Sequence, residues 1–184
     1  PIHFALSYDE EIGCLGLPHM LAVIAERKFQ PSTVIVGEPT GMEVITAHKG
    51  LRAFKTTVSG LEAHSSNPQA GVNAIIVANK LLGFLRSLER DLKNSPDDNN
   101  FNPPYTTINV GMISGGTAIN IVPNSCSFLW EYRSLPNEHP EKILKLFNAF
   151  VKEEYTKTLK AEGVDAEIIT QSIASIPPFQ DLNN

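Results

Sequence analysis

The sequence predicts an α+β protein whose main part is a ferredoxin-like β-α-β-β-α-β sandwich, a four-stranded antiparallel sheet with two helices on one face. Several segments between residues 42 and 176 alternate apolar and polar residues, as strands with one solvated face do. Two segments with apolar residues at helical spacing separate them. The resulting order of elements is that of the split β-α-β arrangement. A different pattern before residue 42 predicts a separate βαβ segment.

The first half of the sandwich is a strand followed by the longest helix. Phe54, Thr56 and Val58 alternate with polar neighbours, which predicts a half-buried strand that ends at Gly60. Residues 71–92 carry isoleucines, leucines and a valine at helical spacing, which predicts an amphipathic helix.

The second half contains two strands, a helix and a last strand. Residues 106–112 and 126–133 alternate in the manner of strands, and residues 164–170 are expected to be the last strand. Pro140 suits the first turn of the second helix. The buried stripe of that helix is expected to be Ile143, Phe147, Phe150 and Val151. An open sheet leaves edges, so an edge strand or helix is available to pair with a second copy.

The residues before the sandwich predict one βαβ unit. Residues 2–7 and 33–36 are apolar runs typical of buried parallel strands, and residues 16–27 present an apolar helical face between them. One such unit is too small to form a sheet, so we expect a piece excised from a larger α/β domain. The expected divisions of the chain are residues 1–41, 42–176 and 177–184, the last being a return linker.

Composition limits the classes of partner. The net charge is −5 and the basic residues are scattered, so neither nucleic acid nor an anionic membrane is an expected partner. No apolar run reaches the length of about 18 residues that a membrane span needs. Cys14 and Cys126 lie far apart in the sequence, which suits a reducing cytoplasm rather than a disulfide framework.

Acidic residues follow both apolar runs of the βαβ unit. Asp9, Glu10 and Glu11 come after the first run, and Glu38 comes after the second. The carboxyl ends of parallel strands meet at one edge of a sheet, where ligands of α/β proteins bind. Like charges that converge there call for a cation. Two other interpretations remain open: the first cluster caps the following helix, and Glu38 lies in a surface turn.

A metal at this edge would explain the cluster chemically. Zinc with oxygen and nitrogen ligands makes a bound hydroxide available near neutral pH. A neighbouring carboxylate can take the proton of that water and later deliver it to a leaving amine. Adjacent side chains can point to different sides, so Glu10 and Glu11 could divide these two roles.

The chain also carries an ordered series of motifs that resembles the zinc-dependent exopeptidase and deacylase family. The family includes acetylornithine deacetylase, succinyl-diaminopimelate desuccinylase and aminoacylase. The motifs are SYDEEIG at 7–13, GEPT at 37–40, HKG at 48–50, GLEAHSSNP at 60–68, GVNAI at 71–75 and GGTAINIVP at 115–123. The stretch WEYRSLP at 130–136 is most similar to the acetylornithine deacetylase branch.

The resemblance implies a role for each matching residue. Glu10 would be the general base that activates water, Glu11 would bind the second zinc ion and Glu38 the first. Cobalt is an alternative metal. His64, in the lid (dimerisation) domain, would reach across a homodimer to stabilise the oxyanion. If the resemblance is set aside, the interpretation of His64 is a loop histidine that caps the helix beginning near residue 71.

Two further residues match lid positions that contact the substrate. These are Asn120 and Arg133, and the planar donors of an arginine suit a substrate carboxylate. The residues alone leave another interpretation of Arg133 open, an ion pair with Glu131 or Glu138.

The implied activity is hydrolysis of the N-acyl amide of an amino acid, most closely N-acetylornithine to ornithine and acetate. A desuccinylase, an aminoacylase or a dipeptidase of the same family remains an alternative, as does a non-catalytic, self-associating ferredoxin-like module. The family's other ligands are a His-x-Asp motif, a bridging Asp and a last His, and this sequence lacks them. Alone, it is therefore expected to bind zinc poorly and to be inactive.

Overall fold

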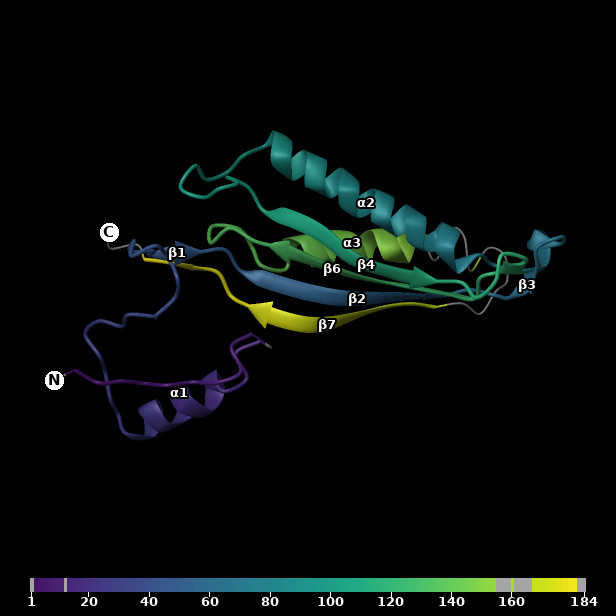
Figure 1. The fold of residues 1–184 in the computed structure, drawn as a ribbon. Coiled ribbons are helices and arrows are strands. Elements are labelled where there is room, and N and C mark those ends of the chain that lie inside the picture. The colour runs from purple at the N-terminus through teal and green to yellow at the C-terminus, as the bar shows by residue number, and fades with distance from the viewer. Residues whose placement is uncertain (1, 12, 155–159, 161–166, 182–184) are drawn as a thin grey trace. The chain divides into compact units, whose positions relative to one another are not determined.

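The computed structural model describes residues 2–11, 13–154, 160 and 167–181. The chain divides into two compact units, Pro1–Val44 and Ile45–Asn184. The second unit holds the sheet of the protein, and the first holds one helix (Figure 1). Within the described residues no helix has the length and apolar character needed to cross a bilayer.

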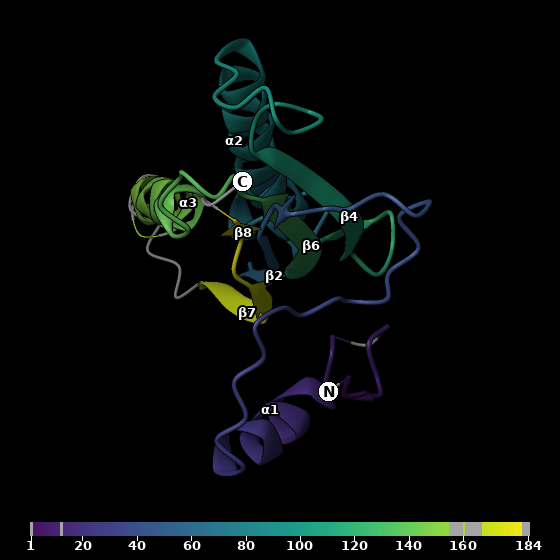
Figure 2. The ribbon, with the colours of Figure 1, turned by 90° about the vertical axis from the view of Figure 1, so that its left-hand side faces the viewer.

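The second unit is built on four antiparallel strands in the order β4-β6-β2-β7 (Figure 1). Their bounds are Leu51–Ser59 for β2, Thr107–Gly115 for β4, Ser125–Arg133 for β6 and Ile168–Ile176 for β7. Two helices, α2 (Ala74–Asn94) and α3 (Lys142–Glu154), pack on the same side of this sheet (Figure 2). The predicted α+β class, with its antiparallel sheet and its helices packed on it, is therefore confirmed.

The core lies between the sheet and the two helices. In β2 the side chains of Phe54, Thr56 and Val58 are buried while Lys55 is exposed, so the predicted alternation is confirmed. In β6 the buried side chains are Cys126, Phe128, Trp130 and Tyr132. The ring centroids of Trp130 and Phe147 of α3 lie 4.7 Å apart. Burial of each such large side chain stabilises the fold by roughly 1.5–3 kcal/mol.

Helix α2 begins three residues later than the sequence pattern predicts. The side chain of Asn73 accepts hydrogen bonds from the backbone N–H groups of Ile75 and Ile76, at 3.0 and 3.1 Å. An asparagine that accepts these bonds is an effective N-cap because the first N–H groups of a helix lack intrahelical partners. The cap, rather than the apolar pattern, fixes where the helix starts.

Two short strand pairs lie at opposite ends of the sheet (Figure 1). Strand β1 (Ala47–His48) pairs with β8 (Phe179–Gln180) at the end where β2 begins. Strand β3 (Ala63–His64) pairs with β5 (Ile121–Val122) beyond the end of β2. We call the first end the proximal end, because the chain enters and leaves the sheet there. Residues 60–73 and 116–123, which extend from the other end, are called the distal arm.

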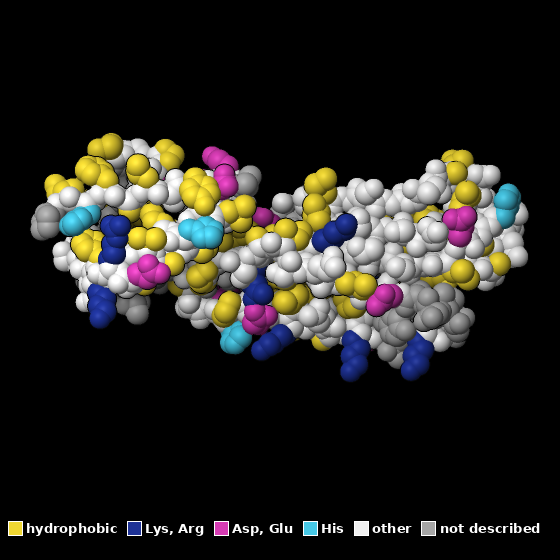
Figure 3. Space-filling view, turned by 90° about the horizontal axis from the view of Figure 1, so that it is seen from below, with side chains coloured by type: hydrophobic (Ala, Val, Ile, Leu, Met, Phe, Trp, Pro, Cys, Tyr) yellow, Lys and Arg dark blue, Asp and Glu magenta, His cyan; other side chains and the backbone are white. Residues whose placement is uncertain are grey.

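The first unit lacks the strands that the sequence predicts. Helix α1 (Leu17–Glu26) is present, but residues 2–7 and 33–36 form no strand. Phe4 and Ile35 are each 91% exposed, and hydrophobic side chains gather at the surface of this unit (Figure 3). The physical reason is that a strand exists only through hydrogen bonds to a neighbouring strand. The predicted last strand of the sandwich began at residue 164, and residues 164–166 lie outside the described residues.

Candidate functional site

The distal arm brings together His64 and Asn120, which are far apart in sequence. His64 pairs with Ile121 in the β3–β5 ladder. The backbone N–H of Ser65 donates to the carbonyl oxygen of Asn120 at 3.0 Å. Both His64 and Asn120 are exposed, so their side chains are accessible to a ligand. Two of the residues that the sequence singles out are therefore neighbours in one accessible structure.

Close backbone approach at two glycines closes the base of the distal arm. A Cβ atom on Gly60 would lie 2.2 Å from the carbonyl oxygen of Val72, and one on Gly71 would lie 2.6 Å from that of Leu61. Such separations are far below van der Waals contact, so only glycine fits at either position. Leu61 and Val72 exchange two backbone hydrogen bonds at this crossing.

The imidazole of His64 has two contacts on one ring nitrogen. The backbone N–H of Ser66 donates to Nδ1 at 3.2 Å, and the Ser66 Oγ lies 2.7 Å from the same atom. Helix α2 is capped by Asn73 instead. The interpretation of His64 as the cap of that helix is therefore wrong.

Arg133 lies at the proximal end, away from the distal arm. Its neighbour Tyr132 pairs with Arg52 near the start of β2, whereas Ser125, at the other end of β6, pairs with Ser59. Strand β6 has nine residues, and at about 3.3 Å per residue its ends are roughly 26 Å apart. A small molecule bound to one copy of the chain could not contact both Arg133 and the distal arm.

Arg133 also has an intramolecular partner. Its Nε donates to Glu131 Oε1 at 3.0 Å, and the two side chains are 47% and 31% exposed. The expected ion pair with Glu131 is thus present. Exposed ion pairs of this kind contribute little stability. Little free energy would therefore be lost if the guanidinium left Glu131 to bind a ligand.

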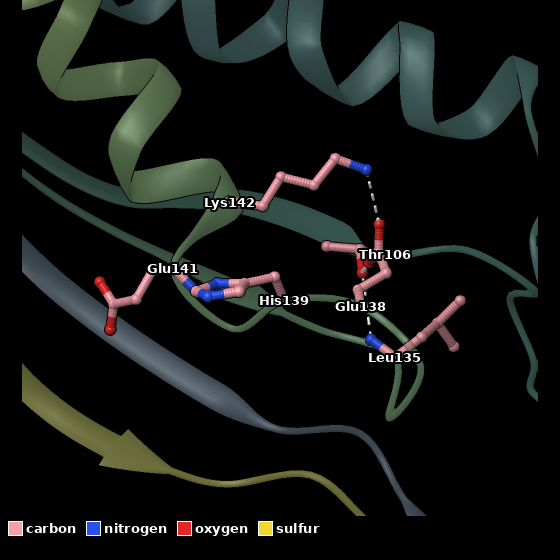
Figure 4. A network of polar contacts seen from close by, with 6 residues as sticks. All are labelled: Thr106, Leu135, Glu138, His139, Glu141 and Lys142. Atoms are coloured by element: carbon pink, nitrogen blue, oxygen red, sulfur yellow. Dashed lines mark hydrogen bonds and ion pairs between the residues drawn. The ribbon is translucent and has the colours of Figure 1, made fainter.

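A polar network fixes the segment that follows Arg133 (Figure 4). The buried Thr106 hydroxyl donates to Glu138 Oε2 and accepts from the backbone N–H of Leu135 at 3.1 Å. Lys142 Nζ donates to the other oxygen of Glu138 at 3.2 Å. Burial lowers the pKa of Lys49, and the Glu138 carboxylate opposes this shift. The hydrogen bonds hold the segment after Arg133 to Thr106, just before the start of β4.

The acidic residues of the first unit lie in irregular, exposed segments. Glu10 and Glu11 lie in a turn in which the Glu10 carbonyl accepts hydrogen bonds from Gly13 and Cys14, at 3.0 and 3.1 Å. Glu38 is exposed and lies in no helix or strand, and its carbonyl oxygen accepts a hydrogen bond from the backbone N–H of Thr40 at 2.9 Å. Helix α1 has Gly16 at its N-cap and no acidic residue in its first turn, so the interpretation of Asp9, Glu10 and Glu11 as its caps is wrong.

The described residues do not supply a complete metal site. Among them no three His, Cys, Asp or Glu side chains are grouped so as to hold a metal ion. The carboxylates of Glu11 and Glu38 are suitable zinc ligands in type, but a zinc site needs three or four protein ligands. Zinc as implied by the resemblance is therefore not accommodated by these residues alone.

Sequence comparison identifies curated relatives that share one name. The chain is 35% identical over 153 residues to an acetylornithine deacetylase of Myxococcus xanthus, covering 83% of this chain and 40% of that protein. It is 30% identical over all 184 residues to an acetylornithine deacetylase of Buchnera aphidicola, covering 46% of that protein. The chain thus spans less than half the length of these relatives.

Structural comparison agrees with the sequence relatives. An aminopeptidase PepT from Bacillus cereus matches with a TM-score of 0.53 and 26% identity, over 76% of this chain and 33% of that one. The profile of the family described as the peptidase dimerisation domain of the M20 group matches residues 46–158, which is more than half of the chain. The chain therefore belongs to the M20 peptidase dimerisation domain family.

Proposed function

We propose that this chain is the lid domain, with a strip of the catalytic domain, of a two-zinc amidohydrolase that removes the N-acyl group of an amino acid. N-acetylornithine is the proposed substrate, and ornithine and acetate are the products. In this proposal residues 1–41 belong to the catalytic domain, residues 42–176 form the lid, and residues 177–184 return toward the catalytic domain. The shared name of the curated relatives at 30–35% identity supports this substrate.

The observation that carries the proposal is that His64 and Asn120 lie close together on an exposed arm. A neutral imidazole and a carboxamide are both hydrogen-bond donors, which is what a developing oxyanion and a polar substrate need. Neither side chain serves the core, since both are exposed. These two side chains therefore suit recognition of a ligand better than they suit stabilisation of the fold.

The length of the sheet separates these residues from Arg133 of their own copy. The distal arm lies beyond the far end of β2. Arg133 lies at the proximal end, roughly 26 Å along β6 from the arm. We therefore propose that the reaction uses Arg133 from one copy and His64 and Asn120 from a partner copy.

Self-association requires an apolar surface, and the edge of the sheet beside α2 offers one. Strand β4 is an outer strand and carries Ile113, which is 56% exposed and lies opposite Phe128 on the face that the helices cover. Helix α2 packs beside β4 and adds Ile76, which is 56% exposed. Apolar residues on an unpaired edge favour a second copy as the occupant, because an isologous contact would cover both copies at once.

The chain's own residues have distinct tasks in the proposed reaction. Glu10 takes a proton from the attacking water and delivers it to the leaving amine. His64 donates a hydrogen bond to the oxyanion that forms when water adds to the amide carbonyl. Arg133 binds the substrate carboxylate with paired N–H groups. Zinc, held in the intact enzyme with further ligands, would acidify water and polarise the amide.

The primary test is a panel of N-acyl amino acids assayed with the intact protein and added zinc. We expect hydrolysis of N-acetylornithine, its loss in Glu10→Gln, and its retention in the matched neighbour Asp9→Asn. A preference for N-succinyl substrates or for dipeptides would replace the substrate but keep the reaction class. No hydrolysis of any panel member by a dimeric, zinc-loaded protein would favour the non-catalytic self-associating module.

Mixed dimers test the assignment of His64 to the partner's site. Glu10→Gln and His64→Ala are each expected to be inactive alone. When the two are co-expressed, half of the dimers combine both variants, and each of these has one site with Glu10 and the partner's His64 intact. We therefore expect roughly a quarter of wild-type activity from random pairing in a symmetric dimer. No recovery would mean that His64 serves its own copy.

A further inference from the structure

The hydrogen bonds around His64 define which of its ring nitrogens carries the proton. A backbone N–H can only donate, and that of Ser66 points at Nδ1 at 3.2 Å. Nδ1 must then present its lone pair. In a neutral imidazole the hydrogen is consequently on Nε2. The Ser66 hydroxyl, 2.7 Å from Nδ1, can donate to the same lone pair.

We infer that Ser66 is a positioning residue that fixes the Nε2–H tautomer of His64, so that the ring presents a hydrogen-bond donor to the substrate. This inference deepens the proposed function and rests on it. Ser66 acts through His64 and need not touch the substrate. Two donors from one residue, the backbone N–H and the hydroxyl, converge on a single nitrogen.

The tautomer decides whether the imidazole helps or hinders the reaction. With Nε2 protonated, the outer edge of the ring donates to a negatively charged oxygen while the ring itself stays neutral. With Nδ1 protonated, the outer nitrogen would present a lone pair and repel that oxygen. His64 is exposed, so solvent alone would allow both tautomers to exchange. A local donor is the means by which an exposed ring can hold one of them.

The chain contains an internal reference for the measurement. Nδ1 of His48 lies 3.1 Å from the carbonyl oxygen of Lys49. A carbonyl can only accept, so His48 is expected to hold the opposite, Nδ1–H tautomer. One spectrum of the chain should therefore contain both tautomers, one at each end of the sheet.

The experiment is a long-range ¹H–¹⁵N correlation spectrum of the ¹⁵N-labelled chain at a pH where histidine is neutral. His64→Asn assigns the His64 signals by their loss. We expect a lone-pair shift for His64 Nδ1 and a protonated shift for Nε2, with His48 reversed. Ser66→Ala should lower the ratio of Nε2–H to Nδ1–H at His64 roughly two- to tenfold, the worth of one hydrogen bond.

Three further variants separate positioning from a structural role. Ser66→Thr keeps the hydroxyl and should restore the tautomer ratio. Ser65→Ala, the matched control, removes a neighbouring hydroxyl from a residue whose backbone contacts Asn120. It should leave the ratio unchanged. In the intact enzyme Ser66→Ala should lower kcat by a similar factor with KM nearly constant, because the interaction develops in the transition state.

The outcomes distinguish this inference from the proposed function. An unchanged ratio in Ser66→Ala, or a wild-type His64 in the Nδ1–H form, would overturn the positioning role and leave the hydrolase proposal standing. Normal turnover in His64→Ala would overturn the role of His64 itself, whatever its tautomer. An equal loss of ratio in Ser65→Ala and Ser66→Ala would show that the arm had merely been disordered.

Discussion

Gly83, in the middle of α2, allows a test of self-association. Substitutions there should stabilise a single copy of the chain but weaken its dimer. A Cβ atom added to Gly83 would meet no atom within 4 Å. Glycine inside a helix is less favourable than alanine by about 1 kcal/mol. Gly83→Ala should therefore stabilise each copy by about 0.5–1 kcal/mol. For a chain of this size that corresponds to a rise in Tm of about 1–4 °C.

If α2 contacts a second copy of the chain, a side chain at position 83 would destabilise that contact. If α2 packs against α2 of a second copy, the absence of a side chain at Gly83 allows close approach. Gly83→Gln would place a long side chain in that contact, and overpacking costs about 1–3 kcal/mol at each affected site. Two copies contribute, so a penalty of at least about 2 kcal/mol is expected, or roughly a 30-fold weaker dimer.

The two effects are measured separately. Thermal unfolding at low protein concentration gives the stability of the single copy, and sedimentation equilibrium gives the dissociation constant. Asn148→Gln is the matched control, because it introduces the same side chain on the exposed face of α3. An unchanged dissociation constant in Gly83→Gln would remove α2 from the contact. A destabilised single copy in Gly83→Ala would show that the space beside Gly83 is not open.

Three further predictions concern stability. Asn73→Ala should destabilise the chain by about 1 kcal/mol in chemical denaturation, because two N–H groups of α2 lose their acceptor, whereas Asn73→Asp should be nearly neutral. Thr106→Val should cost about 1–3 kcal/mol, because Glu138 and the N–H of Leu135 lose a partner, and a neutral effect would mean that water replaces the hydroxyl. Burial raises the pKa of Cys126, so the folded thiol keeps its proton after the unfolded thiol has lost it. Stability should then fall as pH rises above about 8.5, and Cys126→Ala should flatten that slope.

The long strands and helices of the sandwich were predictable because the burial of one face gives a regular spacing of apolar residues in the sequence. Alternation in β6 and helical spacing in α3 each follow from one face meeting the core, and the alternation is confirmed. In α3 Ile143 and Phe147 are buried and Phe150 and Val151 are partly buried, but the helix begins at Lys142, so the prediction that Pro140 lies in its first turn is wrong. The two-residue strands β3 and β5 were not predicted, since two residues carry no period. Their signal lies instead in the glycines that flank them, which permit close backbone approach.

The strands expected at residues 2–7 and 33–36 show a different limit of the sequence pattern. A continuous apolar run indicates that a segment is suited to a buried position. Burial also requires neighbouring strands, which the run itself does not provide. Ile2 and Leu6 are each 88% exposed in this chain. The pattern describes the environment for which these residues are suited, and the hydrogen-bonding partners that would complete it are not among the described residues.

The sequence also does not show how far apart the residues of the candidate site lie. The motif resemblance predicts that His64, Asn120 and Arg133 act in one reaction, yet the order of motifs contains no distances. The register of β6 shows that Arg133 and the distal arm are at opposite ends of a strand roughly 26 Å long. If all three act in one reaction, they must come from two copies of the chain. A substitution that weakens the contact between the α2 helices should then lower activity, although it changes none of these three residues. Activity and dimer content should fall in proportion across the Gly83 series, and a fully active monomer would refute the two-copy site.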